Sequence, residues 1–164
     1  MVFLTPICED DLDFVFDLYS KREVSKYLSK IPCPFTKANA FDLILDLVEK
    51  NRITCNRNMI SRLDHTGERC GIIVLNETCD DRGVLGFSTH PDYQGRGVAS
   101  RSIQLLLSST AIASYRVIQA SSQQDNAAAH TVLAKTGFRV NASGIPEKSV
   151  DGRTRLVDRW TFYP

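Results

Sequence analysis

Hydrophobic positions in the first third of the chain predict a strand followed by two amphipathic helices. Positions 2–7 form a short apolar run that contains Pro6, which is typical of a strand. Acidic residues at 9–11 suit the positive N-terminal end of a helix, and apolar residues then recur at helical spacing. Thr36 is a suitable N-cap for the second helix. The expected buried faces are Leu12, Val15, Phe16 and Tyr19 in the first helix and Phe41, Ile44, Leu45 and Val48 in the second.

From residue 53 onward the hydrophobic pattern changes to a period of two. Residues 53–63, 69–79 and 84–90 are rich in strand-forming side chains and predict three successive strands. Polar residues at 64–68 and 80–83 predict the turns between them, so the first two strands should form a hairpin.

The last part of the chain returns to alternating helices and strands. A helix is expected after the glycines near residue 95, with Val98, Ile103, Leu106 and Leu107 as its apolar face. Residues 116–123 predict a strand, and the helix after it is capped by Asp125–Asn126 and stopped by Gly137. Two strands close the chain, the last with Trp160 and Phe162 in the core. The predicted order is β-α-α-β-β-β-α-β-α-β-β, an α/β fold with a mixed, mostly antiparallel sheet of about six or seven strands flanked by about four helices.

Length and composition are those of a soluble globular protein. The 164 residues fit a single domain over 1–164, and 43% of them are hydrophobic. A net charge of +1 supplies no basic field for nucleic acid. No apolar run approaches the roughly 20 residues of a membrane span, and the N-terminus lacks the basic region of a secretory signal. We therefore expect a cytoplasmic protein without nucleic-acid or membrane partners; the sequence indicates no oligomeric state.

Cysteine and histidine usage does not favour a metal site. The chain has five cysteines without a CxxC pair, and its three histidines lack zinc-ligand spacing. We expect reduced, mostly buried thiols. Cys33 is the one alternative, a catalytic thiol in a loop forced by Pro32 and Pro34, but no partner base is identifiable in the sequence.

The segment 94–99, between a predicted strand and a predicted helix, is the strongest candidate for ligand binding. Its glycines permit positive φ and close approach of the backbone to a ligand, while a helix N-terminus presents free N–H groups and partial positive charge. Together these features suit a phosphate or pyrophosphate, with Arg96 and Arg101 at the rim. A tight turn that binds nothing is the alternative. A Walker loop is excluded because the GK[ST] ending is absent, and a dinucleotide fingerprint because Ser100 stands where its last glycine would be.

Two motifs resemble those of the GCN5-related N-acetyltransferases. Residues 90–100, HPDYQGRGVAS, resemble motif A through Gln94, Gly97 and Ala99. Residues 125–138, DNAAAHTVLAKTGF, resemble motif B. The opening 4–28 and the ending 150–163 are similar to the RimJ/RimL-type branch of ribosomal-protein N-terminal acetyltransferases, so the resemblance spans nearly the whole chain.

The resemblance implies acetyl-CoA as acetyl donor, no metal, and direct transfer to an amine. The pantetheine arm would pair with the edge of strand 84–90, which family members splay from the next strand. A backbone N–H near Phe87 or Ser88 would polarise the thioester carbonyl. Asn126 would contact the pantetheine arm or only cap its helix. The implied cofactor-binding residues are Phe87, Ser88, Thr89, Gln94, Gly95, Arg96, Gly97, Val98, Ala99, Ser100 and Asn126.

The proton-handling residues depart from the family pattern. Positions where relatives carry a tyrosine, a serine and a strand glutamate hold Leu133, Ala129 and Val84. Glu147 matches an acidic position of the RimL-type pattern and is the candidate general base or ammonium-binding group; the alternative is a surface glutamate in a turn containing Pro146.

Further candidates for proton handling come from the same segments. Ser88 and Thr89 could donate to the thioester oxygen or to the departing thiolate. His130 could face the cleft, or lie on its helix without a proton role.

The acceptor implied by this reading is a primary amine, first of all a protein N-terminal α-amine. The alternatives are a small amine such as a polyamine, an amino sugar or an antibiotic, and a catalytically weak acetyl-CoA-binding regulatory protein. We expect the loop 31–35, the second helix and the terminal hairpin to wall the acceptor site.

Overall fold

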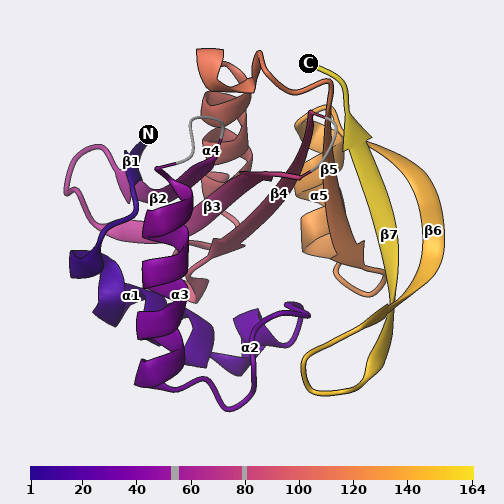
Figure 1. The fold of residues 1–164 in the computed structure, drawn as a ribbon. Coiled ribbons are helices and arrows are strands. Elements are labelled where there is room, and N and C mark those ends of the chain that lie inside the picture. Colours follow the sequence, from indigo (N-terminus) through magenta and orange to yellow (C-terminus); the bar gives the residue numbers. More distant parts are fainter. Residues whose placement is uncertain (53–55, 79–80) are drawn as a thin grey trace.

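Seven strands form one mixed sheet in the order β1-β2-β3-β4-β5-β7-β6 in the computed structural model, which describes residues 1–52, 56–78 and 81–164 (Figure 1). The strands are β1 Val2–Pro6, β2 Arg57–Leu63, β3 Arg69–Glu77, β4 Arg82–Thr89, β5 Val117–Gln123, β6 Arg139–Lys148 and β7 Thr154–Phe162. The α-helices are α1 Leu12–Ser20, α2 Arg22–Ser25, α3 Lys37–Lys50, α4 Val98–Leu107 and α5 Ala127–Lys135.

The predicted fold is confirmed, with one short helix added. Apart from α2, the order of elements is the predicted one, and β2 and β3 form the expected antiparallel hairpin. Thr36 caps α3 by accepting a hydrogen bond from the backbone N–H of Asn39 (3.2 Å). The parts of the predicted strands at 53–55 and 79, and the turn residue 80, lie outside the described residues.

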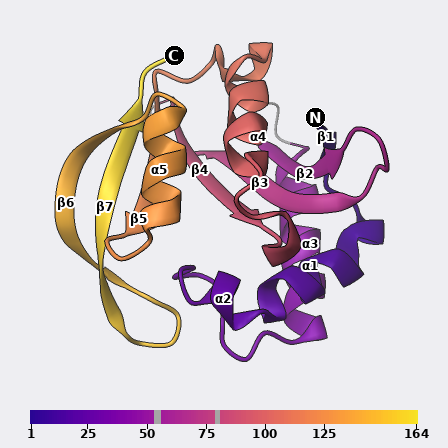
Figure 2. The same cartoon turned by 180° about the vertical axis from the view of Figure 1, so that it is seen from behind.

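Helices cover both faces of the sheet and bury two apolar cores. Figures 1 and 2 show α1 to α3 on one face and α4 and α5 on the other. On the first face Ile60 and Ile72 pack with helix residues such as Val15, and on the second Ile73 and Ile118 pack with residues such as Leu133. Among the described helices, none is long and apolar enough to cross a membrane.

The predicted inner face of α3 was wrong in detail. Ala40, Ile44 and Leu47 are buried, whereas Phe41 is 50% exposed and Leu45 is 41% exposed. Two sets of apolar residues on α3 recur at helical spacing. The set that contains Ala40 faces the sheet, because this small side chain lets the helix pack close to the strands.

The inner face of α1 differs from the prediction in the same way. Leu18, absent from the predicted face, is fully buried, and Leu12 and Phe16 are only partly buried.

The expectation of mostly buried thiols was also wrong where it can be examined. Cys8 and Cys33 are exposed and Cys70 is buried, while positions 55 and 79 lie outside the described residues.

The parallel strands β4 and β5 separate after a short paired stretch. Only Arg82–Val84 pairs, with residues 117–119, and every other neighbouring pair of strands is antiparallel. Beyond Val84 the two strands diverge, so the sheet is split into halves that are joined at one end (Figure 1).

A buried carboxylate ties the start of α1 to the first half of the sheet. Asp11 is fully buried and accepts hydrogen bonds from Arg62 of β2 (3.0 Å) and Arg69 of β3 (2.6 Å). It also accepts a hydrogen bond from the backbone N–H of Cys8 (3.0 Å). These bonds satisfy the charge that burial would otherwise penalise.

Replacing Asp11 should therefore be costly. Asp11→Ala leaves two arginines without their shared acceptor, and the free energy of unfolding should fall by about 3–5 kcal/mol. Urea denaturation followed by circular dichroism measures the loss. The matched control is Asp13→Ala, whose exposed ion pair with Lys37 spans 3.5 Å and should be worth less than about 1 kcal/mol. Equal losses in the two variants would contradict the assignment of Asp11 as a buried anchor.

Candidate active site

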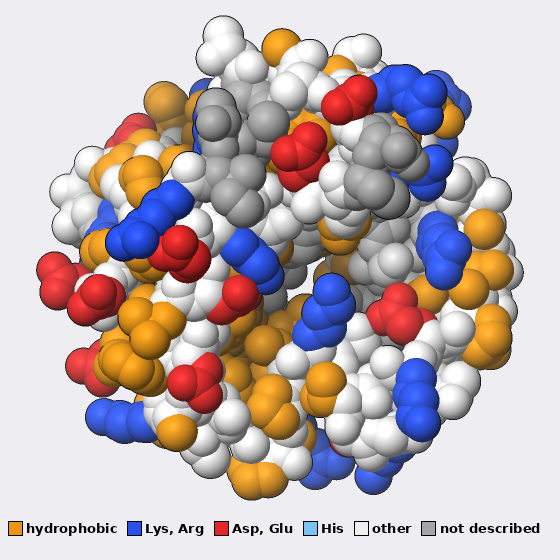
Figure 3. Space-filling model, viewed as in Figure 1, with side chains coloured by type: hydrophobic (Ala, Val, Ile, Leu, Met, Phe, Trp, Pro, Cys, Tyr) orange, Lys and Arg blue, Asp and Glu red, His pale blue; other side chains and the backbone are white. Residues whose placement is uncertain are grey.

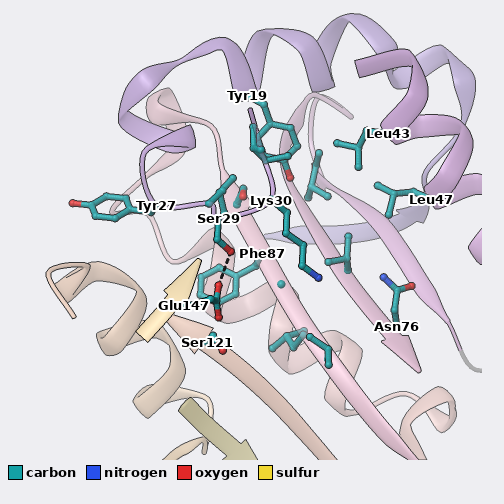
Figure 4. A pocket seen from close by; sticks show the side chains of 18 of the residues that line it. Tyr19, Tyr27, Ser29, Lys30, Leu43, Leu47, Asn76, Phe87, Ser121 and Glu147 are labelled. Atoms are coloured by element: carbon teal, nitrogen blue, oxygen red, sulfur yellow. Dashed lines mark hydrogen bonds between the residues drawn. The ribbon is translucent and has the colours of Figure 1, made fainter. Parts of the chain in front are cut away.

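A cavity of about 560 Å³ lies where β4 and β5 diverge. Its walls come from both halves of the sheet, from α3 and from the segment 27–31, which is here called the strap (Figure 4). Figure 3 shows the hollow in the middle of this face of the molecule, with hydrophobic and charged side chains around it. The cavity therefore joins segments that are far apart in the sequence.

The floor of the cavity follows from alternation of side chains along β3 and β4. Ile72, Val74 and Asn76 of β3 lie opposite Ser88, Gly86 and Val84 of β4, so these six residues share the face that α1 and α3 cover. At Gly86 a Cβ atom would lie 3.0 Å from Val74 Cγ2, so a side chain there would crowd the floor.

The backbone of β4 presents a free edge to the cavity. The N–H of His90 donates to the Cys70 carbonyl of the neighbouring segment (2.9 Å). Because backbone groups alternate along a strand, the amides of Ser88 and Gly86 also point toward β3. The amides of Phe87 and Thr89 then point toward β5, which is not paired with β4 at this level. Of the two amides predicted to polarise a carbonyl, alternation thus selects Phe87 over Ser88.

The Ser88 side chain faces a buried phenol. Ser88 is buried and is joined by a side-chain hydrogen bond to Tyr19 of α1, and both line the cavity. Burial raises the pKa of the Tyr19 phenol, which the Ser88 hydrogen bond only partly offsets, so this hydroxyl keeps its proton at neutral pH. Sequence reasoning missed Tyr19 as a lining residue because its helical spacing indicates only core packing.

Glu147 lies on the opposite wall. It belongs to β6, where it pairs with Arg155 of β7, so it lies in a strand and not in a turn. Its side chain is half-buried, lines the cavity, and accepts a hydrogen bond from Ser29 Oγ at 2.6 Å (Figure 4). The carboxylate is therefore held in place at the edge of the cavity.

Hydrogen bonds to backbone carbonyls fasten the strap and the end of α2 to the second half of the sheet. The Ser29 carbonyl accepts from the N–H of Val150 (2.8 Å), and the Lys26 carbonyl accepts from Arg155 (2.8 Å) and Gln123 (3.3 Å).

The segments expected to wall the acceptor site line this cavity only in part. Residues of α3 and of the terminal hairpin do so. Of the predicted loop 31–35, however, only Ile31 lines it, and Phe35 is buried in the core. Residues 27–30 of the strap were not predicted, because their position depends on hydrogen bonds to residues remote in the sequence, which leave no local pattern.

The glycine loop, residues 94–97, follows the C-terminal end of β4, the end that is not paired with β5. Gly95 and Gly97 have φ of +73° and +77°, and Gly97 is the N-cap of α4. A Cβ atom at either glycine would meet no atom within 4 Å, so the backbone here borders open space. The N–H of Arg101 donates to the Gly97 carbonyl (3.0 Å), and the amides before it belong to the first turn, which an α-helix leaves without internal partners. Gln94 Nε2 donates to the Thr89 carbonyl (3.1 Å) and fixes the loop to the strand.

Asn126 caps α5, because its Oδ1 accepts a hydrogen bond from the N–H of Ala129 (3.1 Å). Leu133 is fully buried in the core, so the position where relatives carry a tyrosine is remote from solvent here. His130 does not line the cavity; its Nε2 lies 3.1 Å from the Gln123 carbonyl and 3.8 Å from Asp158 Oδ2.

Cys33 is likewise not part of the cavity wall. Among the described residues, no group of three or more histidine, cysteine or acidic side chains could hold a metal.

Known proteins share this sequence pattern and this fold. Residues 2–139 match the family model described as an acetyltransferase (GNAT) domain. The chain is 26% identical to spermidine N(1)-acetyltransferase of Escherichia coli (strain K12) over 99% of this chain and 86% of that protein. Its structure resembles spermidine N-acetyltransferase from Vibrio cholerae, solved with CoA and spermine, with a TM-score of 0.82, 20% identity and coverage of 99% and 95% of the two chains.

A structural relative with another acceptor fits equally well. It is an acetyltransferase from Salmonella typhimurium that modifies the N-terminal serine of ribosomal protein L7/L12, with a TM-score of 0.83 and 16% identity over 99% of this chain and 95% of that one. Structural likeness at this level of identity shows a shared fold, and that fold is common to enzymes with both kinds of acceptor. Because the family model covers most of the chain, the protein belongs to the GNAT family of acetyltransferases.

Proposed function

We propose that this acetyltransferase moves the acetyl group of acetyl-CoA directly to the α-amine of a protein N-terminus. The observation that supports this proposal is the free backbone edge of β4. It runs from the open, amide-rich loop at the start of α4 to the cavity that contains Glu147. One continuous track thus connects a site for phosphates with a site for an amine.

The loop residues fit the pyrophosphate of CoA on several grounds. Free amides and the positive end of α4 favour an anion, and the two positive-φ glycines keep the approach open. Arg96 adds a positive charge at the same loop, stacked over the Tyr93 ring at 5.7 Å. We assign the residues from Gln94 to Ser100 to the pyrophosphate, and Phe87 and Thr89 to the pantetheine arm. Asn126 is assigned to ordering the start of α5.

The reaction needs a carbonyl that is polarised and an amine that has lost its proton. Acetyl-CoA supplies the thioester, and the chain supplies the groups around it. The Phe87 N–H points to the free edge and would donate to the thioester oxygen. Glu147 would accept the proton of the incoming ammonium, and Ser29 keeps its carboxylate oriented. Ser88, bonded to Tyr19, would donate a hydrogen bond to the departing thiolate, which then takes its proton from solvent.

An α-amine suits a site with few proton-handling groups. The reference pKa of an α-amine is about 7.7–8.0, against about 10.4 for lysine, so about a third of α-amines are neutral near pH 7.5 but only about one lysine in a thousand. The difference corresponds to about 3 kcal/mol of deprotonation work that the enzyme need not supply.

A small amine is the second candidate acceptor, because two relatives in sequence and two in structure are spermidine acetyltransferases. Mass spectrometry of the products formed from peptides with free N-termini, from spermidine and from amino sugars separates the two acceptors. Turnover of spermidine alone would replace the α-amine proposal. Binding of acetyl-CoA without turnover of any amine would favour a regulatory acetyl-CoA-binding protein.

Acetyl-CoA should stabilise the fold through the glycine loop. At 100 times its Kd the ligand should add about 2.7 kcal/mol, which a thermal-shift assay detects as a higher Tm. Gly97→Glu should abolish this shift, because it places a like charge beside the pyrophosphate. The matched control is Gly67→Glu, at a positive-φ glycine (φ +72°) that also borders open space but lies in the β2–β3 turn. If Gly97→Glu kept the shift, or the control lost it equally, the assignment of the loop would fail.

Glu147→Gln should lower kcat/KM and leave the affinity for acetyl-CoA intact. Loss of a general base costs about 10²–10⁴-fold, and the deficit should shrink as pH rises, because solvent then deprotonates the amine. Steady-state kinetics between pH 6.5 and 9.5 measures both effects. Glu49→Gln, at an exposed α3 residue that pairs with Arg52, is the matched control. A rise in KM with unchanged kcat would make Glu147 an ammonium-binding group instead, and parental activity at every pH would remove it from the site.

A further inference from the structure

We propose that the acceptor is an N-terminal segment with an acidic side chain close to its α-amine, and that Lys30 of the strap binds that carboxylate. This inference rests on the proposed function and narrows its acceptor.

Among the residues that the structure describes, charge pairing around the cavity leaves one cation without a partner. Lys50 donates to Asp46 on the same helix at 2.6 Å, so these two charges neutralise each other. Arg155 is held by Asp151 (3.2 Å) and by the Lys26 carbonyl. For Lys30 the described parts of the chain contain no ion-pair or hydrogen-bond partner. Figure 4 shows its ammonium directed into the cavity, between Phe87 and Asn76.

Lys30 is placed to meet an anion on the bound acceptor. Its side chain lines the cavity and is exposed, so the ammonium is reachable from solvent. A carboxylate on the acceptor would therefore complete the pairing. Solvent weakens an ion pair of this kind, so its contribution to acceptor binding is small.

Asn76 lies beside Lys30 and adds a hydrogen-bond donor for the same carboxylate. Its side chain lines the cavity, with the amide nitrogen toward Lys30 and the oxygen on the far side (Figure 4). The amide nitrogen would therefore donate to a carbonyl or carboxylate oxygen of the acceptor. An ammonium at Glu147 and a carboxylate at Lys30 and Asn76 describe a short acidic N-terminal segment.

The same arrangement disfavours a polycation. Glu147 is the acid that faces the cavity without a cationic partner in the described structure. Glu77 also borders the cavity, but it follows Asn76 in β3, and alternation places its side chain on the opposite face of the sheet. A polyamine would thus find one unpaired carboxylate, because Asp46 is neutralised by Lys50, and would meet the repulsion of Lys30.

A set of peptides with a single charge change tests the inference. Hexapeptides that begin with serine and carry Glu, Gln or Lys at position 2, 3 or 4 differ in nothing else. Acetylated products quantified by mass spectrometry should show kcat/KM about two- to fivefold higher for Glu than for Gln at one position, mainly through KM, and lower again for Lys. Free glutamate and spermidine are included as small acceptors.

Variants of Lys30 test whether its charge causes the preference for Glu over Gln peptides. Lys30→Met should remove the difference between Glu and Gln peptides, and Lys30→Glu should reverse the order of Glu and Lys peptides. Lys37→Met, at an exposed residue of α3 outside the cavity, should keep the parental preference.

Each failure has a distinct meaning. Equal rates for Glu and Gln peptides in the parent enzyme, or a preference that survives Lys30→Met, would overturn the inference while N-terminal acetylation stands. Free glutamate acetylated faster than every peptide would overturn the peptide as carrier. Binding of acetyl-CoA with no acetylated peptide would overturn the proposed function itself.

Discussion

The short parallel pairing between β4 and β5 is the constraint on which the site depends. Three residue pairs hold the two strands together at one end, and beyond Val84 each strand continues with a different neighbour. A parallel pair cannot be joined by a tight turn, so α4 must cross between the strands, and its N-terminus comes to lie past the end of β4. The free strand edge, the cavity and the amide-rich loop all follow from this one separation.

The cavity is closed by contacts between distant parts of the chain. Ser29 and Glu147 are 118 positions apart in the sequence, yet their side chains form a hydrogen bond of 2.6 Å. This bond and the backbone bonds of Lys26 and Ser29 bring the strap to the β6–β7 hairpin. The cavity wall is therefore built from segments that are remote in the sequence and that meet only in the folded protein. The same bonds place the Lys30 ammonium in the cavity and, through it, the acceptor specificity that we infer.

The alternation of groups along β4 explains how one strand could serve the two ligands that we propose. Its side chains alternate between the two helix-covered faces, and its backbone amides alternate between β3 and the free edge. Ser88 thus uses its side chain toward Tyr19, while the neighbouring Phe87 offers its backbone to the free edge. Because side chains and backbone amides both alternate along a strand, two adjacent residues can present different groups: Ser88 its side chain on one face, and Phe87 its N–H at the free edge.

The sequence by itself determined the order of elements, the fold and the position of the glycine loop. Hydrophobic periodicity, the cap at Thr36 and the stop at Gly137 are local signals, and local signals are readable because each depends on neighbours within a few residues. Glu147 was also found from the sequence, as a candidate that still awaits its test.

The tertiary structure alone decided which stripe of α3 is buried, that Phe87 and not Ser88 offers its amide, and that the strap walls the cavity. It also placed Tyr19, Lys30 and Asn76 around one space. These outcomes depend on packing and on hydrogen bonds between residues remote in sequence. Spacing along the chain can offer two faces of a helix or two amides of a strand, but only the packed partner selects between them.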